Sequence, residues 1–230
     1  MYQNQRIGAI ILMAGNGSRF GTKTPKQFLP LNQKRVYLHT LDTFTETAVF
    51  DEIVLVCPEG WLEMVAEEAP HTTVLLGGKT RQESSYLGLQ GFSQKPDIVV
   101  IHDAVRPFVS KKILFRNIHQ AIAHGAVDTC IASADTLVHA PGGKTIAAIP
   151  KREDYLRGQT PQTFRFDWIW QAHQATNTEG AHDDCQLLLK QGRQIHIVEV
   201  NDTNFKITTE TDLALAEIII QTKKYTTNTN

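Results

Sequence analysis

Short apolar runs rich in β-branched residues alternate along the chain with longer segments of helical periodicity. The apolar runs predict six strands, at residues 7–13, 52–57, 73–76, 97–102, 127–133 and 195–200. Helices are expected between and after them, at residues 36–45, 61–68, 81–92, 111–124, 166–174, 183–190 and 209–222. Residues 98–101 are apolar at every position, which is typical of a parallel strand covered on both faces. The pattern predicts an α/β sandwich with a mostly parallel sheet, in which ligands bind beyond the carboxyl ends of the strands.

One stretch, residues 136–163, breaks this alternation. It carries Pro141-Gly142-Gly143 and two short β-like pieces, with no helix long enough to cross between parallel strands. We expect a hairpin that turns around residues 141–144 and leaves the main sheet as a projecting β-arm. Because a two-stranded ribbon is marginally stable alone, the arm is expected to pack on a second subunit. The 230 residues are therefore expected to form a single domain with this arm as an appendage.

Composition and charge narrow the classes of function. A formal net charge of −1 argues against a general binder of nucleic acid or of membrane surfaces. Three widely spaced cysteines, Cys57, Cys130 and Cys185, without a CxxC motif, argue against disulfides and zinc and indicate a reducing compartment. No segment approaches about 18 uninterrupted apolar residues, and the N-terminus lacks the features of a signal peptide. These features predict a cytoplasmic protein.

The first predicted strand ends in a glycine-rich loop, residues 14–21 with the sequence AGNGSRFG, which is followed by Pro25-Lys26-Gln27. Glycine allows backbone N–H groups to approach an anion closely, and Arg19 and Lys26 add two cations. The spacing fits neither the dinucleotide fingerprint nor the Walker A motif, and Pro25 prevents a helix from running through Lys26. The segment predicts an open phosphate-binding loop, the alternative being an ordinary loop with incidental basic residues.

A second glycine pair, Gly77-Gly78, follows a predicted strand and precedes a helix. Backbone N–H groups at such a helix start can bind a phosphate or a base, at the same sheet edge as the first loop. Thr80 can also act simply as the N-cap of that helix, and the two interpretations are compatible.

A carboxylate follows the most hydrophobic predicted strand, in the sequence His102-Asp103-Ala104-Val105-Arg106-Pro107. An acid at the carboxyl end of a buried strand suits a divalent metal ion or a substrate hydroxyl. Arg106 can reach a phosphate, or it can form an ion pair with Asp103 that only holds the loop. His102 is interpreted as a packed structural residue.

Two more cations lie at element ends: Arg152 in the expected arm, and Lys206 before the last helix. That helix is expected to be capped by Thr209, with Asp212 three residues later. The sequence contains no G-x-S-x-G turn and no pair of histidines at helical metal-ligand spacing. Cations, glycine loops and a few carboxylates suit phosphoryl or nucleotidyl transfer, where positioning and charge neutralisation supply most of the catalysis.

Six motifs occur in order along the chain: Ala14-Gly15-x-Gly17-x-Arg19, Pro25-Lys26-Gln27, Gly77-Gly78-x-x-Arg81-Gln82-x-Ser84, His102-Asp103-Ala104-x-Arg106-Pro107, Gln159-Thr160-Pro161-Gln162 and Lys206-Ile207-Thr208. Together, over residues 7–218, they resemble the cytidylyltransferase family that includes 2-C-methyl-D-erythritol 4-phosphate and ribitol-5-phosphate cytidylyltransferases. The resemblance implies a Rossmann-like nucleotidyltransferase fold, a homodimer joined by the arm, and transfer of CMP from CTP to a polyol phosphate with Mg²⁺.

The resemblance also implies roles for individual residues. Arg19 and Lys26 match cations that stabilise the transition state, and Arg152, reaching in from the partner subunit, and Lys206 match cations that position the polyol phosphate. The residues expected to bind CTP are Leu12, Met13, Ala14, Gly15, Gly17, Gly78, Lys79, Arg81 and Ser84. The residues expected to bind the second substrate are Asp103, Arg106, Arg152, Thr160 and Lys206, with Asp103 as the candidate Mg²⁺ ligand.

Some positions depart from the pattern of the methylerythritol enzymes. Lys79 stands where those enzymes often have an acid, and Asp183-Asp184-Cys185-Gln186 is closer to ribitol-type members. Arg81-Gln82-x-Ser84 favours the methylerythritol type. We expect methylerythritol phosphate as the substrate, with ribitol 5-phosphate as the alternative. A non-catalytic nucleotide-binding protein is the alternative of another class, and the presence of both Arg19 and Lys26 argues against it.

Overall fold

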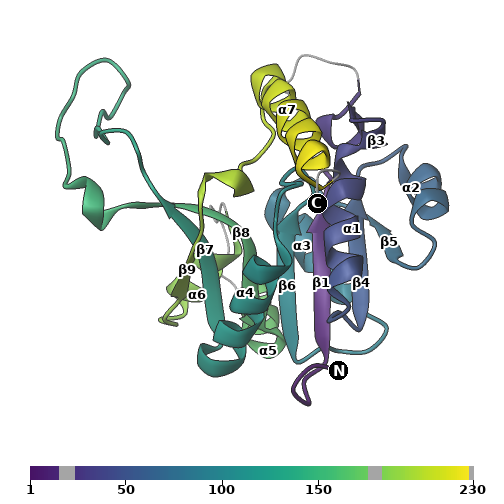
Figure 1. The fold of residues 1–230 in the computed structure, drawn as a ribbon. Helices are drawn as coiled ribbons and strands as arrows, with labels where there is room; N and C mark the ends of the chain where they lie inside the picture. The colour runs from purple at the N-terminus through teal and green to yellow at the C-terminus, as the bar shows by residue number, and fades with distance from the viewer. Residues whose placement is uncertain (16–23, 176–182, 228–230) are drawn as a thin grey trace.

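A computed structural model describes residues 1–15, 24–175 and 183–227, apart from the side chains of residues 223–227. A seven-stranded sheet with the order β5-β4-β1-β6-β8-β7-β9 crosses the molecule (Figure 1). Its strands are β1 (Ile7–Leu12), β4 (Glu52–Cys57), β5 (Thr73–Leu76), β6 (Ile98–Asp103), β7 (Ala126–Ala132), β8 (Leu156–Arg165) and β9 (His196–Glu199). All neighbours are parallel except at β8, which is antiparallel to both β6 and β7. The expected mostly parallel α/β sheet is confirmed.

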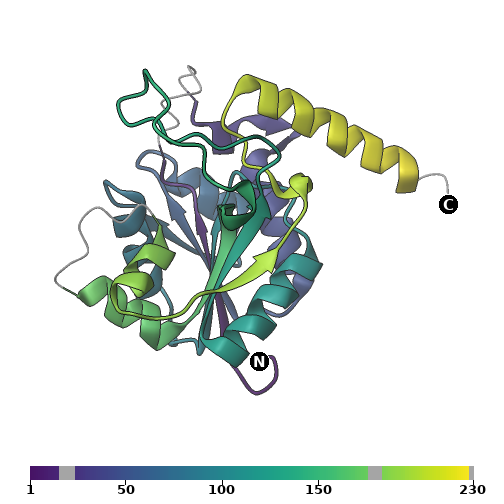
Figure 2. The ribbon, with the colours of Figure 1, turned by 90° about the vertical axis from the view of Figure 1, so that its left-hand side faces the viewer.

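Helices cover both faces of this sheet (Figures 1 and 2). One face packs against α1 (Val36–Thr47), α2 (Leu62–Glu68) and α4 (Lys111–His124), and the other against α3 (Arg81–Gln90), α5 (Phe166–Gln174) and α6 (Asp184–Lys190). Successive residues of β1 enter the two cores alternately, as the pleat of a strand requires, and all six are buried. Burial of each large side chain contributes about 1.5–3 kcal/mol, which explains why fully apolar runs occupy the centre.

A third apolar cluster joins α7 (Glu210–Thr227) to the small hairpin of β2 (Pro30–Leu31) and β3 (Lys34–Arg35). Figure 2 shows α7 lying across one end of the sheet. The predicted cap of this helix is confirmed, because Asp212 N donates to Thr209 Oγ1 (3.2 Å) and Thr209 N donates to Asp212 Oδ2 (2.8 Å). Within the described part of the chain, no helix is both long and apolar enough to cross a bilayer.

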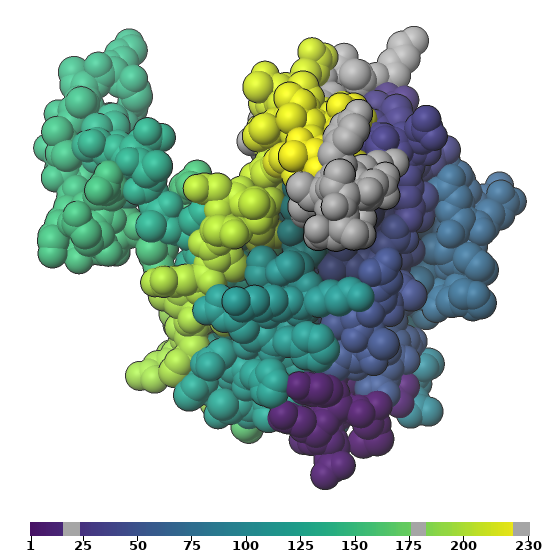
Figure 3. All heavy atoms as spheres, in the orientation of Figure 1, coloured from purple at the N-terminus to yellow at the C-terminus, as the bar shows by residue number. Residues whose placement is uncertain are grey.

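The strand β8 corrects the expected limits of the arm. Residues 156–163, which were expected to belong to the projecting arm, lie in β8 between β6 and β7. The segment that leaves the sheet is residues 133–155, called the arm below, and it stands away from the rest of the molecule in Figures 1 and 3. The expected turn is present, with positive φ at Gly142 and Gly143, but its two sides meet at one isolated bridge, His139 with Ala148.

Candidate active site

The carboxyl ends of the central strands bring the two predicted loops to one edge of the sheet. Leu12, the last residue of β1, lies in register with Asp103, the last residue of β6. The carbonyl of Leu12 accepts a hydrogen bond from Ala104 N (2.9 Å), and Met13 N donates to Val56 O (2.9 Å). The first residues expected to bind the nucleotide therefore leave the sheet directly beside Asp103.

Lys26 is held in place by its two following neighbours. It begins the short 3-10 helix η1 (Lys26–Phe28). The side-chain amide of Gln27 donates to Met13 O (2.5 Å) and Gly15 O (3.0 Å). These two hydrogen bonds join the helix to the first residues of the glycine-rich loop. The ring of Phe28 is buried in the core. The backbone of Lys26 is thus fixed next to the loop that the sequence identifies as a phosphate site.

The second glycine loop touches the first. An added Cβ at Gly77 would lie 2.2 Å from the Cβ of Ala14, a contact that real Cβ atoms do not make. Gly77 N also donates to Cys57 O (2.8 Å), which continues the pairing of β4 with β5. Glycine is needed at this position because the two loops approach each other so closely.

The start of α3 is organised by its own side chains. Thr80 accepts a hydrogen bond from Glu83 N (3.0 Å), which confirms the expected N-cap. Ser84 Oγ donates to Thr80 O (2.9 Å) and accepts from Gly78 N (3.1 Å), so this hydroxyl shapes the loop. Lys79 is exposed, and its N–H donates to Glu83 Oε2 (2.7 Å).

Three cations surround the carboxylate of Asp103, which is 7% exposed. Lys206 Nζ lies 2.8 Å from Oδ2, Arg106 Nε lies 3.7 Å from the same oxygen, and Arg81 Nε lies 3.8 Å from Oδ1. Burial raises the pKa of Asp103, but the positive charges of Lys206, Arg81 and Arg106 outweigh it and hold the pKa well below its usual range. Asp103 is therefore ionised at neutral pH, with three positively charged side chains around it.

Neighbouring polar groups fix this cluster. Asp103 N donates to Thr160 Oγ1 (3.1 Å), and Arg106 Nη1 donates to Asn204 O (3.0 Å). The amide of Asn204 in turn donates to Thr160 O (2.9 Å). The structure thus brings together Asp103, Arg106, Thr160 and Lys206, as expected. Asn204 was not among the expected site residues, because nothing in its type or spacing distinguishes it from a surface amide.

His102 has the structural role expected of it. Its Nδ1 lies 3.0 Å from Thr160 Oγ1 and its Nε2 lies 3.2 Å from Arg106 O. Complete burial lowers its pKa to about 4, so the ring is neutral at physiological pH. A neutral imidazole fixed at both nitrogens supports the loop and is not available to transfer protons.

The structure does not bring Arg152 to this cluster within one subunit. Arg152 lies in the exposed arm, in the short 3-10 helix η2 (Arg152–Asp154), where its guanidinium donates to Ala134 O (2.9 Å). Gly17 and Arg19, the remaining residues expected in the first loop, lie outside the described residues.

Residues 7–222 match the family model of 2-C-methyl-D-erythritol 4-phosphate cytidylyltransferase (IspD). The chain belongs to the IspD family. It is 36% identical to 2-C-methyl-D-erythritol 4-phosphate cytidylyltransferase of Geotalea uraniireducens, over 94% of this chain and 97% of the relative. It is 34% identical to ribitol-5-phosphate cytidylyltransferase of Lactiplantibacillus plantarum, over 94% of this chain and 98% of the relative.

Solved structures agree with this assignment. The 4-diphosphocytidyl-2C-methyl-D-erythritol synthase of Anaerococcus prevotii superimposes with a TM-score of 0.84 at 26% identity, covering 94% of this chain and 96% of that one. The 2-C-methyl-D-erythritol 4-phosphate cytidylyltransferase of Thermus thermophilus gives 0.77 at 31% identity, covering 92% and 98%. The protein is therefore a cytidylyltransferase with the nucleotidyltransferase fold, and its relatives divide between two polyol phosphates.

The carboxylate expected to bind magnesium does not fit that role in this arrangement. Asp103 already contacts Lys206 and lies near two guanidinium groups, which compete with a divalent cation for its oxygens. Elsewhere in the cytidylyltransferase, no group of three or more His, Cys, Asp or Glu side chains among the described residues could hold a metal ion.

Asp128, a residue that sequence reasoning missed, lies beside the cluster on β7 of the cytidylyltransferase. Its carboxylate accepts hydrogen bonds from Gln162 Nε2 (3.1 Å) and Cys130 Sγ (3.4 Å). Burial raises its pKa to about 6, only partly offset by these hydrogen bonds. The signal available in the sequence was a charged residue inside a predicted apolar strand. Asp128 is buried because α6 and β8 cover it, and the strand pattern does not predict where those two elements lie.

We expect Asp128→Asn to stabilise the cytidylyltransferase at pH 7.5 by about 1–3 kcal/mol. The pKa of Asp128 is raised on folding, so the stability that its protonated form contributes is present below about pH 4 and is lost as the pH rises through about 6. Asparagine imitates the protonated form at every pH. Urea unfolding at pH 7.5 and at pH 4 should show a gain that disappears in acid.

Asp212→Asn is the matched control, because the hydrogen bonds of Thr208 and Thr209 lower the pKa of Asp212 despite the opposing effect of burial. That variant should lose stability at pH 7.5, and its deficit should shrink as the pH falls. A gain for Asp128→Asn that is equal at both pH values would contradict the burial of an ionised carboxylate.

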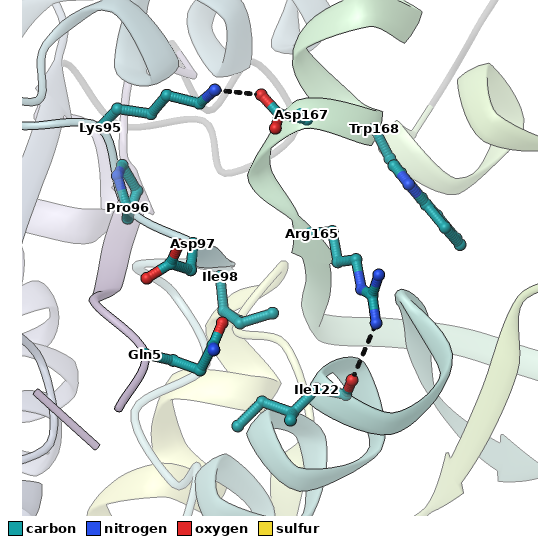
Figure 4. A pocket seen from close by; sticks show the side chains of 9 residues that line it. All are labelled: Gln5, Lys95, Pro96, Asp97, Ile98, Ile122, Arg165, Asp167 and Trp168. Atoms are coloured by element: carbon teal, nitrogen blue, oxygen red, sulfur yellow. Dashed lines mark hydrogen bonds and ion pairs between the residues drawn. The ribbon is translucent and has the colours of Figure 1, made fainter. Parts of the chain in front are cut away.

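A groove of about 480 Å³ lies at the other end of the sheet (Figure 4). It is lined by residues at the amino ends of β1 and β6, such as Gln5 and Ile98, together with Arg165 and Trp168 after β8. None of the residues expected to bind substrate lines this groove. Because ligands of parallel sheets bind beyond the carboxyl ends of the strands, we place the active site at the opposite edge.

Proposed function

We propose that the protein transfers CMP from CTP to 2-C-methyl-D-erythritol 4-phosphate and releases pyrophosphate. The observation that carries the proposal is the group of three cations on Asp103, next to two glycine loops that contact each other. Two phosphate-bearing substrates repel each other, and an edge with bare amides and several cationic side chains lowers that repulsion.

The reaction needs little covalent help from the protein. An oxygen of the polyol phosphate attacks the α-phosphorus of CTP, a new P–O bond forms, and the bond to the β-phosphate breaks as pyrophosphate leaves. The attacking oxygen is already anionic, so no general base is required. Lys26, fixed by Gln27, and Arg19 stabilise the negative charge of the pentavalent transition state.

Lys206, Arg106 and Asp103 bind the polyol phosphate. The side chain of Lys206 is 36% exposed, so its ammonium can contact an incoming phosphate while it remains near Asp103. The ionised carboxylate of Asp103 is an acceptor for a polyol hydroxyl. In this arrangement the cations bind the phosphate of the substrate, and the carboxylate binds a hydroxyl of its polyol part.

We propose that magnesium enters with CTP, because Mg²⁺ prefers phosphate oxygens and water and needs few protein carboxylates. It supplies charge neutralisation on the triphosphate. Arg81, Arg106 and Lys206 neutralise Asp103, so we expect the triphosphate of CTP, and not this carboxylate, to bind the metal ion.

We also propose a homodimer in which the arm contacts a second subunit. Large apolar side chains on the arm face solvent, with exposed fractions of 52% at Val138, 60% at Ile146 and 63% at Ile149. Burying them requires a partner surface, and Arg152 on the same arm would then reach the partner's site. The three buried free thiols suit a reducing cytoplasm.

The substrate is tested by incubating the protein with CTP and Mg²⁺ and either methylerythritol phosphate or ribitol 5-phosphate, and measuring pyrophosphate release. We expect a kcat/KM for methylerythritol phosphate at least about tenfold higher, which corresponds to about 1.4 kcal/mol of transition-state binding. The 36% identical relative and the solved structures support this choice, and the 34% identical relative supports ribitol 5-phosphate.

A control with EDTA should abolish turnover, and replacing CTP by UTP should reduce it strongly. A preference for ribitol 5-phosphate would transfer the proposal to the synthesis of CDP-ribitol. Binding of CTP without turnover of either polyol would favour a non-catalytic nucleotide-binding protein.

A further inference from the structure

A buried carboxylate on α6, Asp184, connects two helices to the active site. Its Oδ1 accepts hydrogen bonds from Ser85 Oγ (2.7 Å) and lies 3.1 Å from His173 Nε2. Its Oδ2 accepts from Arg81 Nη1 (2.6 Å). The side chain of Asp184 is 1% exposed, so this charge depends entirely on its partners.

Arg81 stands between this carboxylate and the catalytic edge. Its Nη1 contacts Asp184, and its Nε lies 3.8 Å from Asp103 Oδ1. Arg81 is the first residue of α3, and Ser85 lies one turn later on the same face, so α3 presents both side chains to Asp184. A continuous chain of contacts therefore runs from His173 through Asp184 and Arg81 to Asp103.

The orientation of the guanidinium distinguishes this chain from a simple structural ion pair. Arginine–carboxylate ion pairs are frequently bidentate, with two nitrogens on two oxygens. Here one oxygen of Asp184 is taken by Ser85 and His173, and Arg81 Nη2 is buried without a hydrogen-bond partner among the described residues. The guanidinium is thus turned so that Nε faces Asp103.

We propose that Asp184 is a positioning residue of the polyol-phosphate site, which it controls by holding the Arg81 guanidinium against Asp103. This inference rests on the proposed function for the identity of the substrate. It assigns Arg81 to the polyol side of the site, whereas the sequence placed it with the nucleotide. Asp184 touches neither substrate, and it acts through the place and charge that it gives to Arg81.

The test uses Asp184→Asn in the full-length protein. Asparagine keeps the hydrogen-bonding capacity toward Ser85 and His173 but removes the charge that holds Arg81. We expect kcat/KM for the polyol phosphate to fall at least about tenfold, while KM for CTP changes less than about twofold. Asp184→Glu, which restores the charge, should recover part of the loss.

Asp51→Asn is the matched control. Asp51 is also an acid tied by two hydrogen bonds, to the N-terminal amine (2.8 Å) and Ile7 N (2.8 Å), but at the opposite end of β1. It should lower the melting temperature and leave both Michaelis constants unchanged. If Asp184→Asn behaves in the same way, or raises both KM values equally, the positioning role is wrong.

A measurement without substrate separates this inference from the proposed function. In ¹⁵N-labelled protein, the Arg81 Nε–H signal, assigned by its loss in Arg81→Lys, should exchange slowly with water in the wild type. Exchange should become at least about tenfold faster in Asp184→Asn and stay unchanged in Asp51→Asn. If the wild type turns over neither polyol, the proposed function fails, and this signal alone decides whether Asp184 holds Arg81.

Discussion

Lys26→Ala should lower kcat by about 10²–10³-fold while KM for CTP rises less than about fivefold. The backbone of Lys26 is fixed by Gln27, whose amide binds both Met13 and Gly15, so we expect its ammonium to act from a fixed point beside the loop. A charge placed in advance stabilises the transition state more than the bound nucleotide, because negative charge builds up as the two phosphates approach. Steady-state kinetics with varied CTP measure both constants.

Lys34→Ala is the control for the general loss of a cation near this loop. Lys34 lies in the neighbouring hairpin and forms an ion pair with Asp42. We expect its kcat to stay within about twofold of the wild type. A rise in KM for CTP with kcat unchanged in Lys26→Ala would show that Lys26 binds the nucleotide and has no separate effect on the transition state.

Arg19→Ala and Arg152→Ala proteins, each inactive alone, should recover about a quarter of the wild-type activity when refolded together at equal concentrations. Half of the dimers formed at random contain one subunit of each kind. In such a dimer we expect one of the two sites to receive an intact Arg19 from its own subunit and an intact Arg152 from the partner's arm, and the other site to receive neither. If half of the dimers each have one active site out of two, a quarter of all sites are active.

Mixing Arg19→Ala with Lys206→Ala is the matched control. Both residues are expected to serve the site of their own subunit, so every site in the mixed dimer lacks one of them and activity should stay absent. If the first mixture also remained inactive while mixed dimers formed, Arg152 would not serve the partner's site.

The strands that could be predicted from sequence are those with continuous apolar runs, which indicate burial without any knowledge of the neighbouring elements. Residues 98–101 can only be buried, and β6 is found there. The sequence of β8 contains Arg157, Gly158 and Pro161, which separately suggest a loop. It is a strand because its polar groups have partners elsewhere: Thr160 binds Asp103 N, and Gln162 binds Asp128. Such pairings are tertiary and leave no periodic signal.

The candidate site was predictable to a similar degree. Element ends are visible in sequence, so Asp103, Arg106 and Lys206 were placed at one edge, and the structure brings them together. The partners of a guanidinium are not visible, because they depend on how helices pack. The contact of Arg81 with Asp184, more than a hundred residues later, therefore left no signal in the sequence.

The place of β8 in the sheet bears on the order in which the chain can assemble during synthesis. β1, β4, β5 and β6 are made within the first 103 residues and can pair among themselves, but the free side of β6 is covered only by residues 156–165. A nascent chain that has not yet released this segment exposes the edge of β6, whose first four residues are all apolar. Unpaired apolar edges of this kind pair readily with other chains, so we expect the ribosome-bound half-product to aggregate more readily than the folded protein.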